Sequence, residues 1–325
     1  MIITKSPLRI SFTGGGTDIE HFYKLHDGHV VSIAINKYVY TCVNKKFDDD
    51  LRICYSKTEN VSNISSIKHQ LIKTVLNHFS IRKGLEIVSI ADVPGNGSGL
   101  GSSSSFTCSL VQSINYFLKK KILSKENLSK LSYNLEKGED SLSAGKQDHY
   151  ASVYGGLNYL IFKRNGGVKV NKIILNKPFK QKLENSLFLV YTGISHNTKK
   201  NLTEQVKFIN NSKVKNLIKL TELSKVLAED FKNNNLENLG DILNESWSIK
   251  KKISNKITNF KIDQMYKDII IQGAAGGKLL GSGGGGFLLF YAKNNKKFDI
   301  LKRLKNKKII NFEIDLNGTN VLYRT

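Results

Sequence analysis

Apolar and polar residues alternate over much of the first forty positions, with the period of two that is typical of half-buried β-strands. Leu8, Ile10 and Phe12 share one side of the first strand, and further apolar runs occupy 30–41. Over 64–79 the period lengthens, because apolar residues recur at intervals of four, which predicts a helix. The first part of the chain therefore combines strands with helices.

The rest of the chain repeats this mixture. A strand is predicted at 85–91, and helices follow from the serine run after 101 and over 125–137. Beyond the polar stretch 171–185 we expect a strand at 187–192, two long helices, a glycine-rich hairpin with a strand at 273–291, a basic helix and a final strand near 321–323. We predict an α+β protein with an N-terminal domain of residues 1–185 and a C-terminal domain of residues 186–325.

Net charge changes this picture little. The 325 residues include 50 basic and 27 acidic side chains, giving a formal net charge of +23. Such a charge can attract nucleic acid, membrane surfaces or anionic substrates. Six of the basic residues are arginine, and lysine runs such as 119–121 and 250–252 contain no aromatic residue for stacking on bases. We interpret the charge as a solvated surface that helps attract anions and keep nucleic-acid binding as a remote alternative.

Cysteine spacing and hydropathy restrict the compartment. Cys42, Cys54 and Cys108 match neither a disulfide framework nor a metal motif. No apolar run approaches the ~20 residues that span a bilayer, and the first residues lack the layout of a signal peptide. We therefore expect a cytoplasmic protein.

A glycine- and serine-rich segment, residues 94–105, joins the strand at 85–91 to an amphipathic helix. Helix N-termini bind anions through unpaired N–H groups and the helix dipole, and glycines allow close approach of a polyphosphate. The segment is not a G-x-x-x-x-G-K-[ST] loop, since no lysine follows its last glycine. An ordinary turn with a helix cap is the alternative, but four consecutive serines favour a phosphate site.

Three other segments carry candidate chemistry. Arg9 interrupts an apolar strand ahead of the turn Gly14–Asp18, where Asp18 could accept hydrogen bonds from sugar hydroxyls or simply cap the turn. Asp148 follows a helix that contains Glu136, and a kinase needs one carboxylate for the acceptor hydroxyl and another for Mg²⁺. The many glycines of 273–287 indicate close backbone approach, either to a ligand or to another loop.

Taken in order, these segments resemble the GHMP kinase superfamily, which includes galactokinase, homoserine kinase and mevalonate kinase. Residues 94–105 are similar to its P-x-x-x-G-L-G-S-S motif, and 278–287 are similar to its C-terminal glycine motif. The resemblance runs from Pro7 to Phe287. It implies a ribosomal protein S5-like N-terminal domain, a ferredoxin-like C-terminal domain, and phosphoryl transfer from ATP, with Mg²⁺, to an alcohol group.

Within the superfamily, the chain resembles the D-glycero-D-manno-heptose 7-phosphate kinases. This resemblance rests on three motifs: P-L-R-I-S-F-x-G-G-G-T-D at 7–18, G-K-Q-D at 145–148, and V-Y-T-G-I-S at 190–195. This resemblance implies phosphorylation of the anomeric hydroxyl to give the 1,7-bisphosphate, for nucleotide-activated heptose and surface polysaccharide such as capsule or lipopolysaccharide. A fucokinase- or galactokinase-like enzyme acting on another sugar is the alternative.

The resemblance also implies roles for individual residues. Asp148 would act as general base or orienting carboxylate, and Arg9 would stabilise both that carboxylate and the transferring phosphate. Ser103, or its neighbour Ser102, and Glu136 would hold Mg²⁺. The expected ATP-binding residues are Pro94, Gly97, Ser98, Gly99, Leu100, Gly101, Ser102, Ser103 and Ser104. The expected substrate residues are Gly15, Gly16, Thr17, Asp18, Lys146, Gln147 and Gly284.

Two positions depart from the family pattern, and the substrate's own phosphate has no assigned site. His149 follows the expected catalytic Asp where Gln is usual, which could alter substrate contacts, and Phe106 ends the serine run where a small residue is usual. Lys146 and Lys199 are candidates for binding the sugar's phosphate. We expect a sugar phosphate and ATP as the partners, with no nucleic acid and no membrane, and a homodimer stays open.

Overall fold

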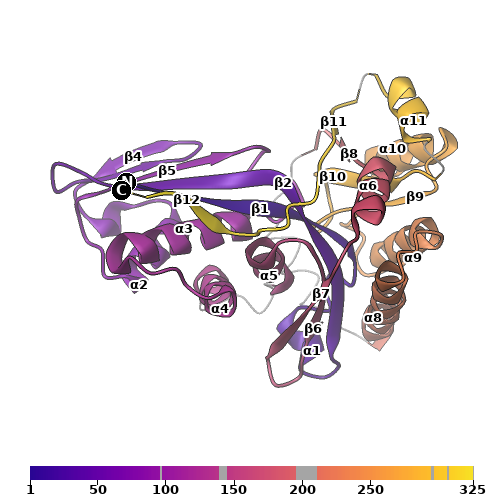
Figure 1. Ribbon diagram of the computed structural model, residues 1–325, viewed down its shortest axis with the longest axis horizontal. Coiled ribbons are helices and arrows are strands. Elements are labelled where there is room, and N and C mark those ends of the chain that lie inside the picture. Colours follow the sequence, from indigo (N-terminus) through magenta and orange to yellow (C-terminus); the bar gives the residue numbers. More distant parts are fainter. Residues whose placement is uncertain (96, 139–144, 195–210, 294–295, 306, 325) are drawn as a thin grey trace.

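The computed structural model describes residues 1–95, 97–138, 145–194, 211–293, 296–305 and 307–324. Within these residues the chain forms two sheets, each accompanied by helices (Figure 1). The larger sheet has eight strands in the order β12-β1-β2-β5-β3-β4, and β6 and β7 extend it from β2. Its strands are β1 (Ile2–Thr13), β2 (Gly28–Lys45), β3 (Leu51–Cys54), β4 (Thr58–Val61), β5 (Leu85–Ala91), β6 (Leu157–Phe162), β7 (Val168–Ile173) and β12 (Asn320–Arg324).

The long strand β2 organises this sheet. One of its edges pairs with β1, antiparallel, along most of its length. Its other edge is shared: residues 28–33 pair with β6 and residues 39–45 pair with β5. The β6–β7 hairpin therefore projects from one end of β2, beside the short helix α1 (Glu20–Tyr23), as Figure 1 shows.

Helices cover one face of the larger sheet (Figure 1). They are η1 (Ile64–Ser66), α2 (Gln70–His78), α3 (Ser102–Lys119), α4 (Lys125–Lys137) and α5 (Gln147–Tyr154). Helix α3 lies centrally, and Leu110, Val111 and Ile114 on it are fully buried. Its N-terminus is therefore held in a fixed place beside β1, at the end of residues 94–101, the segment expected to bind phosphate and called the phosphate loop below.

The second sheet is smaller and wholly antiparallel, in the order β11-β8-β10-β9. Its strands are β8 (Leu187–Tyr191), β9 (Gly276–Leu279), β10 (Phe287–Tyr291) and β11 (Ile309–Ile310), and the helices around it are α6 (Lys177–Ser186), α8 (Asn211–Lys232), α9 (Leu239–Lys251), α10 (Phe260–Ile271) and α11 (Lys297–Arg303). Every residue of β9 and β10 is buried, since both faces of these strands are covered. None of the helices described is both long and apolar enough to cross a membrane.

Most of the predicted elements are present, but the β6–β7 hairpin and α6 were not predicted, and one helix begins later than expected. The helix expected over 64–79 begins at Gln70, because the Asn63 side chain caps a separate 3₁₀ turn and the His69 side chain accepts the Ile72 N–H. The polar stretch 171–185 contains α6, which the Asn176 side chain caps by accepting the Phe179 N–H at 2.8 Å.

The last strand departs from a domain division at residue 186. Strand β12 pairs antiparallel with β1, so it belongs to the sheet of the N-terminal domain, and both chain ends lie together at one end of that sheet (Figure 1). The reason is that β1 has a second edge, opposite β2, which would otherwise lack hydrogen-bond partners. Residues 320–324 are therefore part of the first domain's architecture.

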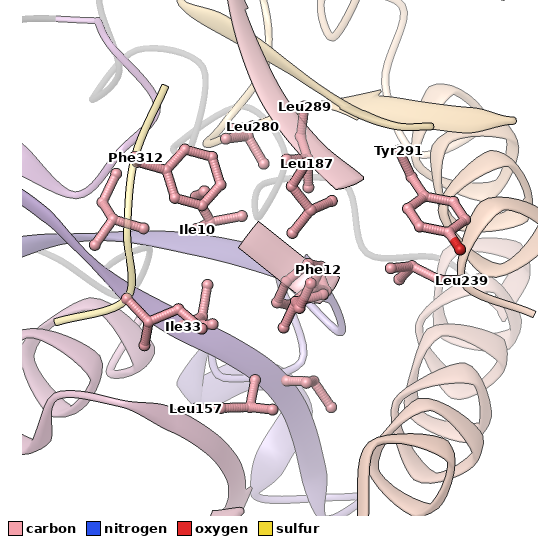
Figure 2. Close-up of a cluster of buried hydrophobic side chains, with 14 of the residues drawn as sticks. Ile10, Phe12, Ile33, Leu157, Leu187, Leu239, Leu280, Leu289, Tyr291 and Phe312 are labelled. Atoms are coloured by element: carbon pink, nitrogen blue, oxygen red, sulfur yellow. The ribbon is translucent and has the colours of Figure 1, made fainter. Parts of the chain in front are cut away.

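A large hydrophobic cluster crosses between the two parts of the chain (Figure 2). It joins Ile10, Phe12 and Ile33 from the larger sheet with Leu187 and Leu289 from the smaller one. The rings of Phe12 and Phe231 meet edge to face, with centroids 5.4 Å apart. Since such packing removes apolar surface from water on both sides at once, the two domains stabilise each other.

We expect Phe231→Ala to lower the free energy of unfolding by about 3–5 kcal/mol, because it leaves a cavity in this shared cluster. Phe260→Ala is the matched control, since Phe260 is 82% exposed and should change stability by less than about 0.5 kcal/mol. Urea unfolding followed by far-UV circular dichroism and by Trp247 fluorescence measures both. Because the core is shared, the two signals should coincide; separate transitions for the two probes would contradict this account.

Candidate active site

A bidentate ion pair between Arg9 and Asp148 lies at the centre of the candidate site. The guanidinium donates from Nε to Oδ1 and from Nη2 to Oδ2, both at 2.7 Å. Arg9 lies on β1 and Asp148 in the first turn of α5. The Arg9 side chain is 5% exposed and that of Asp148 is 24% exposed, so the carboxylate keeps an edge that a substrate hydroxyl can reach.

Arg9 also holds the phosphate loop in place. Its Nη1 donates to the carbonyl oxygen of Gly99 at 2.6 Å, and its backbone N–H donates to that of Leu100 at 3.0 Å. A Cβ at Gly101 would lie 3.2 Å from Arg9 Cγ and 3.4 Å from Asp148 Oδ2. One side chain therefore connects the candidate base to the loop expected to hold ATP.

The phosphate loop presents the N-terminus of α3. Gly101 is the N-cap residue, with a φ of 76°, and it has no side chain to accept the first-turn N–H groups. Ser98 Oγ lies 2.9 Å from Ser102 Oγ. The first-turn amides and the positive end of the helix dipole form an anion-binding arrangement. Among the other residues expected to bind ATP, Pro94 and Ser103 are exposed, whereas Gly97, Leu100 and Ser104 are buried.

The two glycine-rich segments pack directly against each other. The Phe287 N–H donates to the Ser98 carbonyl oxygen at 3.0 Å. A Cβ at Gly281 would come within 2.5 Å of Gly99 Cα, and one at Gly286 within 2.4 Å of the Ser98 carbonyl oxygen. The glycines of 273–287 were expected to approach either a ligand or another loop. The structure shows contact with another loop, so the C-terminal domain packs against the phosphate loop.

Glu136 forms a polar cluster beside the start of α3. One of its carboxylate oxygens lies 2.7 Å from His149 Nε2 and accepts from Thr107 Oγ1 at 3.0 Å. Burial opposes its ionisation, but the charge and hydrogen bond of His149 and the hydroxyls of Ser103 and Thr107 outweigh burial and lower the pKa of Glu136 to about 2. His149, 1% exposed, thus faces Glu136 from inside the protein.

Ser103 and Glu136 fit one side of a Mg²⁺ site, because they bring a hydroxyl and an ionised carboxylate together at the phosphate loop. Magnesium in nucleotide sites usually takes one or two carboxylates together with phosphate oxygens and water. No group of three His, Cys, Asp or Glu side chains that could hold a metal occurs in the part of the chain that the structure describes. These residues therefore suit a metal that is bound jointly with phosphate.

The loop expected to contact the sugar is largely engaged with the protein itself. Asp18 is 1% exposed; its Oδ1 accepts from the Gly16 N–H and from Gln147 Nε2, and its Oδ2 accepts from the Gln147 N–H at 3.1 Å. Burial, then the nearby Asp148, raises the pKa of Asp18. Thr17 is fully buried and its hydroxyl donates to the Gly14 carbonyl at 2.8 Å. Asp18 thus fixes the beginning of α5, next to Asp148.

The expected substrate contacts differ in accessibility. Gly15 and Gly16 are partly exposed beside Gln147, whose Oε1 is buried without a partner among the described residues. The Gly284 N–H already donates to the Ile257 carbonyl at 2.8 Å. Lys146 Nζ donates to the Gly166 carbonyl at 2.7 Å and lies 4.4 Å from the Tyr23 ring centroid. Lys199 lies outside the described residues.

Two buried lysines near this site were not expected from the sequence. Lys250 is 9% exposed on α9, and Lys278 is 3% exposed on β9. In a chain with so many lysines neither is distinctive by composition. A signal exists for Lys250, because it follows Leu243 and Trp247 at intervals of four and three and so shares their buried helix face.

Comparison with known proteins identifies the class. The family model for the N-terminal domain of GHMP kinases matches residues 66–156, and the model for the GHMP kinase C-terminal domain matches residues 227–309. The chain belongs to the GHMP kinase family and is an ATP-dependent sugar kinase, a phosphotransferase. The prediction of the family and of its two-domain α+β fold is confirmed.

Individual relatives refine this picture. The chain is 28% identical to the D-glycero-alpha-D-manno-heptose 7-phosphate kinase of Campylobacter jejuni over 94% of this chain and 93% of that protein. It is 25% identical to the bifunctional fucokinase/GDP-fucose pyrophosphorylase of Arabidopsis thaliana, over 90% of this chain and 30% of that longer protein. The crystal structure of a D-glycero-D-manno-heptose 1-phosphate kinase from Bacteroides thetaiotaomicron has the same fold, with a TM-score of 0.81, 24% identity and full coverage of both chains.

We expect Gly281→Ala to reduce kcat/KM for ATP by about tenfold or more, because a Cβ there would displace the Gly99 backbone and with it the phosphate loop. Gly84→Ala is the matched control. Both glycines have a similar φ, +71° and +68°, but a Cβ at Gly84 meets only the Asp48 carbonyl oxygen at 3.7 Å. The backbone strain is then shared by both variants, and steady-state kinetics isolates the contact. Equal losses in the two variants would refute the coupling.

Proposed function

We propose that this kinase phosphorylates the anomeric hydroxyl of D-glycero-D-manno-heptose 7-phosphate to give the 1,7-bisphosphate. The product would supply nucleotide-activated heptose for surface polysaccharide. The observation that carries this proposal is the similarity, over 94% of the chain, to the heptose 7-phosphate kinase of Campylobacter jejuni. The contacts of the G-K-Q-D segment support the proposal, since Asp148 pairs with Arg9 and Gln147 donates to Asp18.

In the proposed reaction, the Asp148 carboxylate orients the C1 hydroxyl and accepts its proton as the C1 oxygen attacks the γ-phosphorus. The bond from that phosphorus to the β,γ-bridging oxygen breaks, and ADP leaves. Arg9 fixes the carboxylate by two hydrogen bonds of 2.7 Å and adds positive charge beside the transferred group. Phosphoryl transfer depends mainly on such positioning and electrostatic stabilisation.

We further propose that the first-turn amides of α3 bind the phosphates of ATP and that Ser103 and Glu136 hold Mg²⁺. The metal would neutralise charge on the phosphates. His149 and Thr107 keep Glu136 in place and ionised, which is the state that a cation requires. His149 would therefore act on the metal side of the site rather than on the sugar.

A kinase of another sugar is the second candidate, because the chain also resembles the plant fucokinase over 90% of its length. The names of the two similar heptose kinases also differ. The Campylobacter jejuni protein is named a heptose 7-phosphate kinase, and the Bacteroides thetaiotaomicron protein is named a heptose 1-phosphate kinase.

We expect coupled ADP release with ATP to be fastest with D-glycero-D-manno-heptose 7-phosphate, by at least about tenfold in kcat/KM over heptose 1-phosphate, fucose and galactose. The product should show phosphorus at both C1 and C7 by ³¹P NMR. Turnover of fucose or galactose with none of the heptose phosphate would exclude the proposed substrate while leaving the kinase assignment intact.

We expect Asp148→Asn to lower kcat by about 10²–10⁴-fold, the contribution that a general base usually makes, while the Kd for ATP changes little. Asp241→Asn is the control, since Asp241 is exposed on α9, and its kinetics should match the parent enzyme. Single-turnover kinetics and calorimetric ATP binding separate the two effects. A fall in kcat of less than about tenfold would assign the base elsewhere.

A further inference from the structure

The ammonium group of Lys250 is buried at the junction between the domains. Lys250 lies at the C-terminal end of α9, and its Nζ donates to the carbonyl oxygen of Gly281 in the second glycine segment. Among the described residues, no carboxylate oxygen lies within 4.0 Å of this ammonium. One neutral acceptor is thus its recorded partner, although an ammonium has three N–H donors.

This ammonium group lies next to the catalytic pair. Gly281 packs on Gly99, and the Gly99 carbonyl accepts from Arg9 Nη1. Lys250 is also close enough to Arg9 to be repelled by it, and close enough to Asp18 and Asp148 to be attracted by them. The backbone of Gly281 and Gly99 therefore connects Lys250 with Arg9, the side chain that binds Asp148.

Several basic side chains gather at this junction, and among the described residues the Lys250 ammonium has no ion-pair partner of its own. Asp148 is already paired with Arg9 at 2.7 Å. Lys278 adds a second buried amine, whose Nζ donates to the carbonyl oxygens of Ser11 and Phe12 at 3.2 and 2.9 Å. Burial, then repulsion by Lys250 and Arg9, lowers the pKa of Lys278 well below its usual value. Burial, then repulsion by Arg9, lowers the pKa of Lys250 to about 8, so roughly nine-tenths of it is still charged at pH 7. A buried cation without a counter-ion costs stability unless an anion binds it.

We propose that Lys250 binds a phosphate oxygen of a substrate at this junction, in addition to its contact with Gly281. The phosphate has two sources, the γ-phosphate of ATP and the phosphate ester of the sugar. The proposal depends on the kinase class, which the family shows; its sugar arm alone rests on the proposed acceptor. Lys250 would then be the contribution of the C-terminal domain to a charge site whose other members come from the N-terminal domain.

The test compares Lys250→Met with Lys251→Met. Lys251 is the next residue, its side chain is 38% exposed, and it pairs with Asp263 at 3.6 Å. Calorimetry with the non-hydrolysable analogue AMP-PNP and with ADP measures the γ-phosphate arm. If Lys250 contacts that group, Lys250→Met should weaken AMP-PNP binding by about tenfold or more and ADP binding by less than about threefold. The control should bind both as the parent enzyme does.

A second measurement tests the sugar phosphate. It determines KM for heptose 7-phosphate and for unphosphorylated heptose in the parent enzyme, in Lys250→Met and in Lys251→Met. A rise of about tenfold or more for the phosphorylated sugar alone assigns Lys250 to that phosphate instead. If heptose phosphates are not substrates at all, the proposed acceptor fails, but the nucleotide arm still decides the role of Lys250. Unchanged binding of both ligands would overturn the proposal.

Thermal unfolding distinguishes a binding role from a structural one. An unpaired buried ammonium replaced by an apolar side chain of similar length should leave the unliganded protein as stable as before, or more so. A lower Tm together with equal weakening of AMP-PNP and ADP would mean that Lys250 only supports the fold, and would also overturn the proposal. Should Lys250→Met not fold, Lys250→Arg carries the test, because it keeps the charge and should preserve the preference for AMP-PNP over ADP.

Discussion

The hydrogen bonds of the Arg9 guanidinium are the interactions on which the site depends, because they connect three separate segments of the chain. The guanidinium donates twice to Asp148 at the start of α5 and once to the Gly99 carbonyl of the phosphate loop, while its own strand β1 lies between β12 and β2 in the larger sheet. The planar fork of arginine can satisfy all of these acceptors at fixed angles. Asp148 and the loop before α3 are therefore fixed relative to each other through one side chain that hydrogen-bonds to both.

The domain junction extends this constraint to the C-terminal domain. Gly99 and Gly281 meet backbone to backbone, and the hydrophobic cluster around Phe12 continues from one sheet to the other (Figure 2). Glycine loses more conformational entropy on folding than other residues, so a run of glycines is unfavourable unless close approach requires it. Here the approach is between two loops, which holds the C-terminal domain, and with it Lys250, at a defined distance from Gly99 and the start of α3.

The sequence predicted the fold class, the family and most of the long elements, because these depend on local periodicity and contiguous motifs. It missed the β6–β7 hairpin, although Leu157–Phe162 is largely apolar. It did not predict that Asn320–Arg324 pairs with β1, because that pairing joins strand edges from opposite ends of the chain. The contact of His149 with Glu136 likewise depends on tertiary packing. Local sequence carries no record of such distances.

The distribution of arginine in the chain also indicates that the geometry at Arg9 requires a guanidinium group. Of the six arginines in this lysine-rich chain, Arg9 alone is buried, and Arg52, Arg82, Arg164, Arg303 and Arg324 are all exposed. Lysine serves elsewhere in the interior: Lys250 and Lys278 each donate to backbone carbonyls, which a single ammonium can do. Only at Arg9 must one cation bind both oxygens of a carboxylate and a carbonyl at once, and an ammonium lacks the fixed fork for that. The choice of side chain at each buried cation thus follows from the geometry of its acceptors.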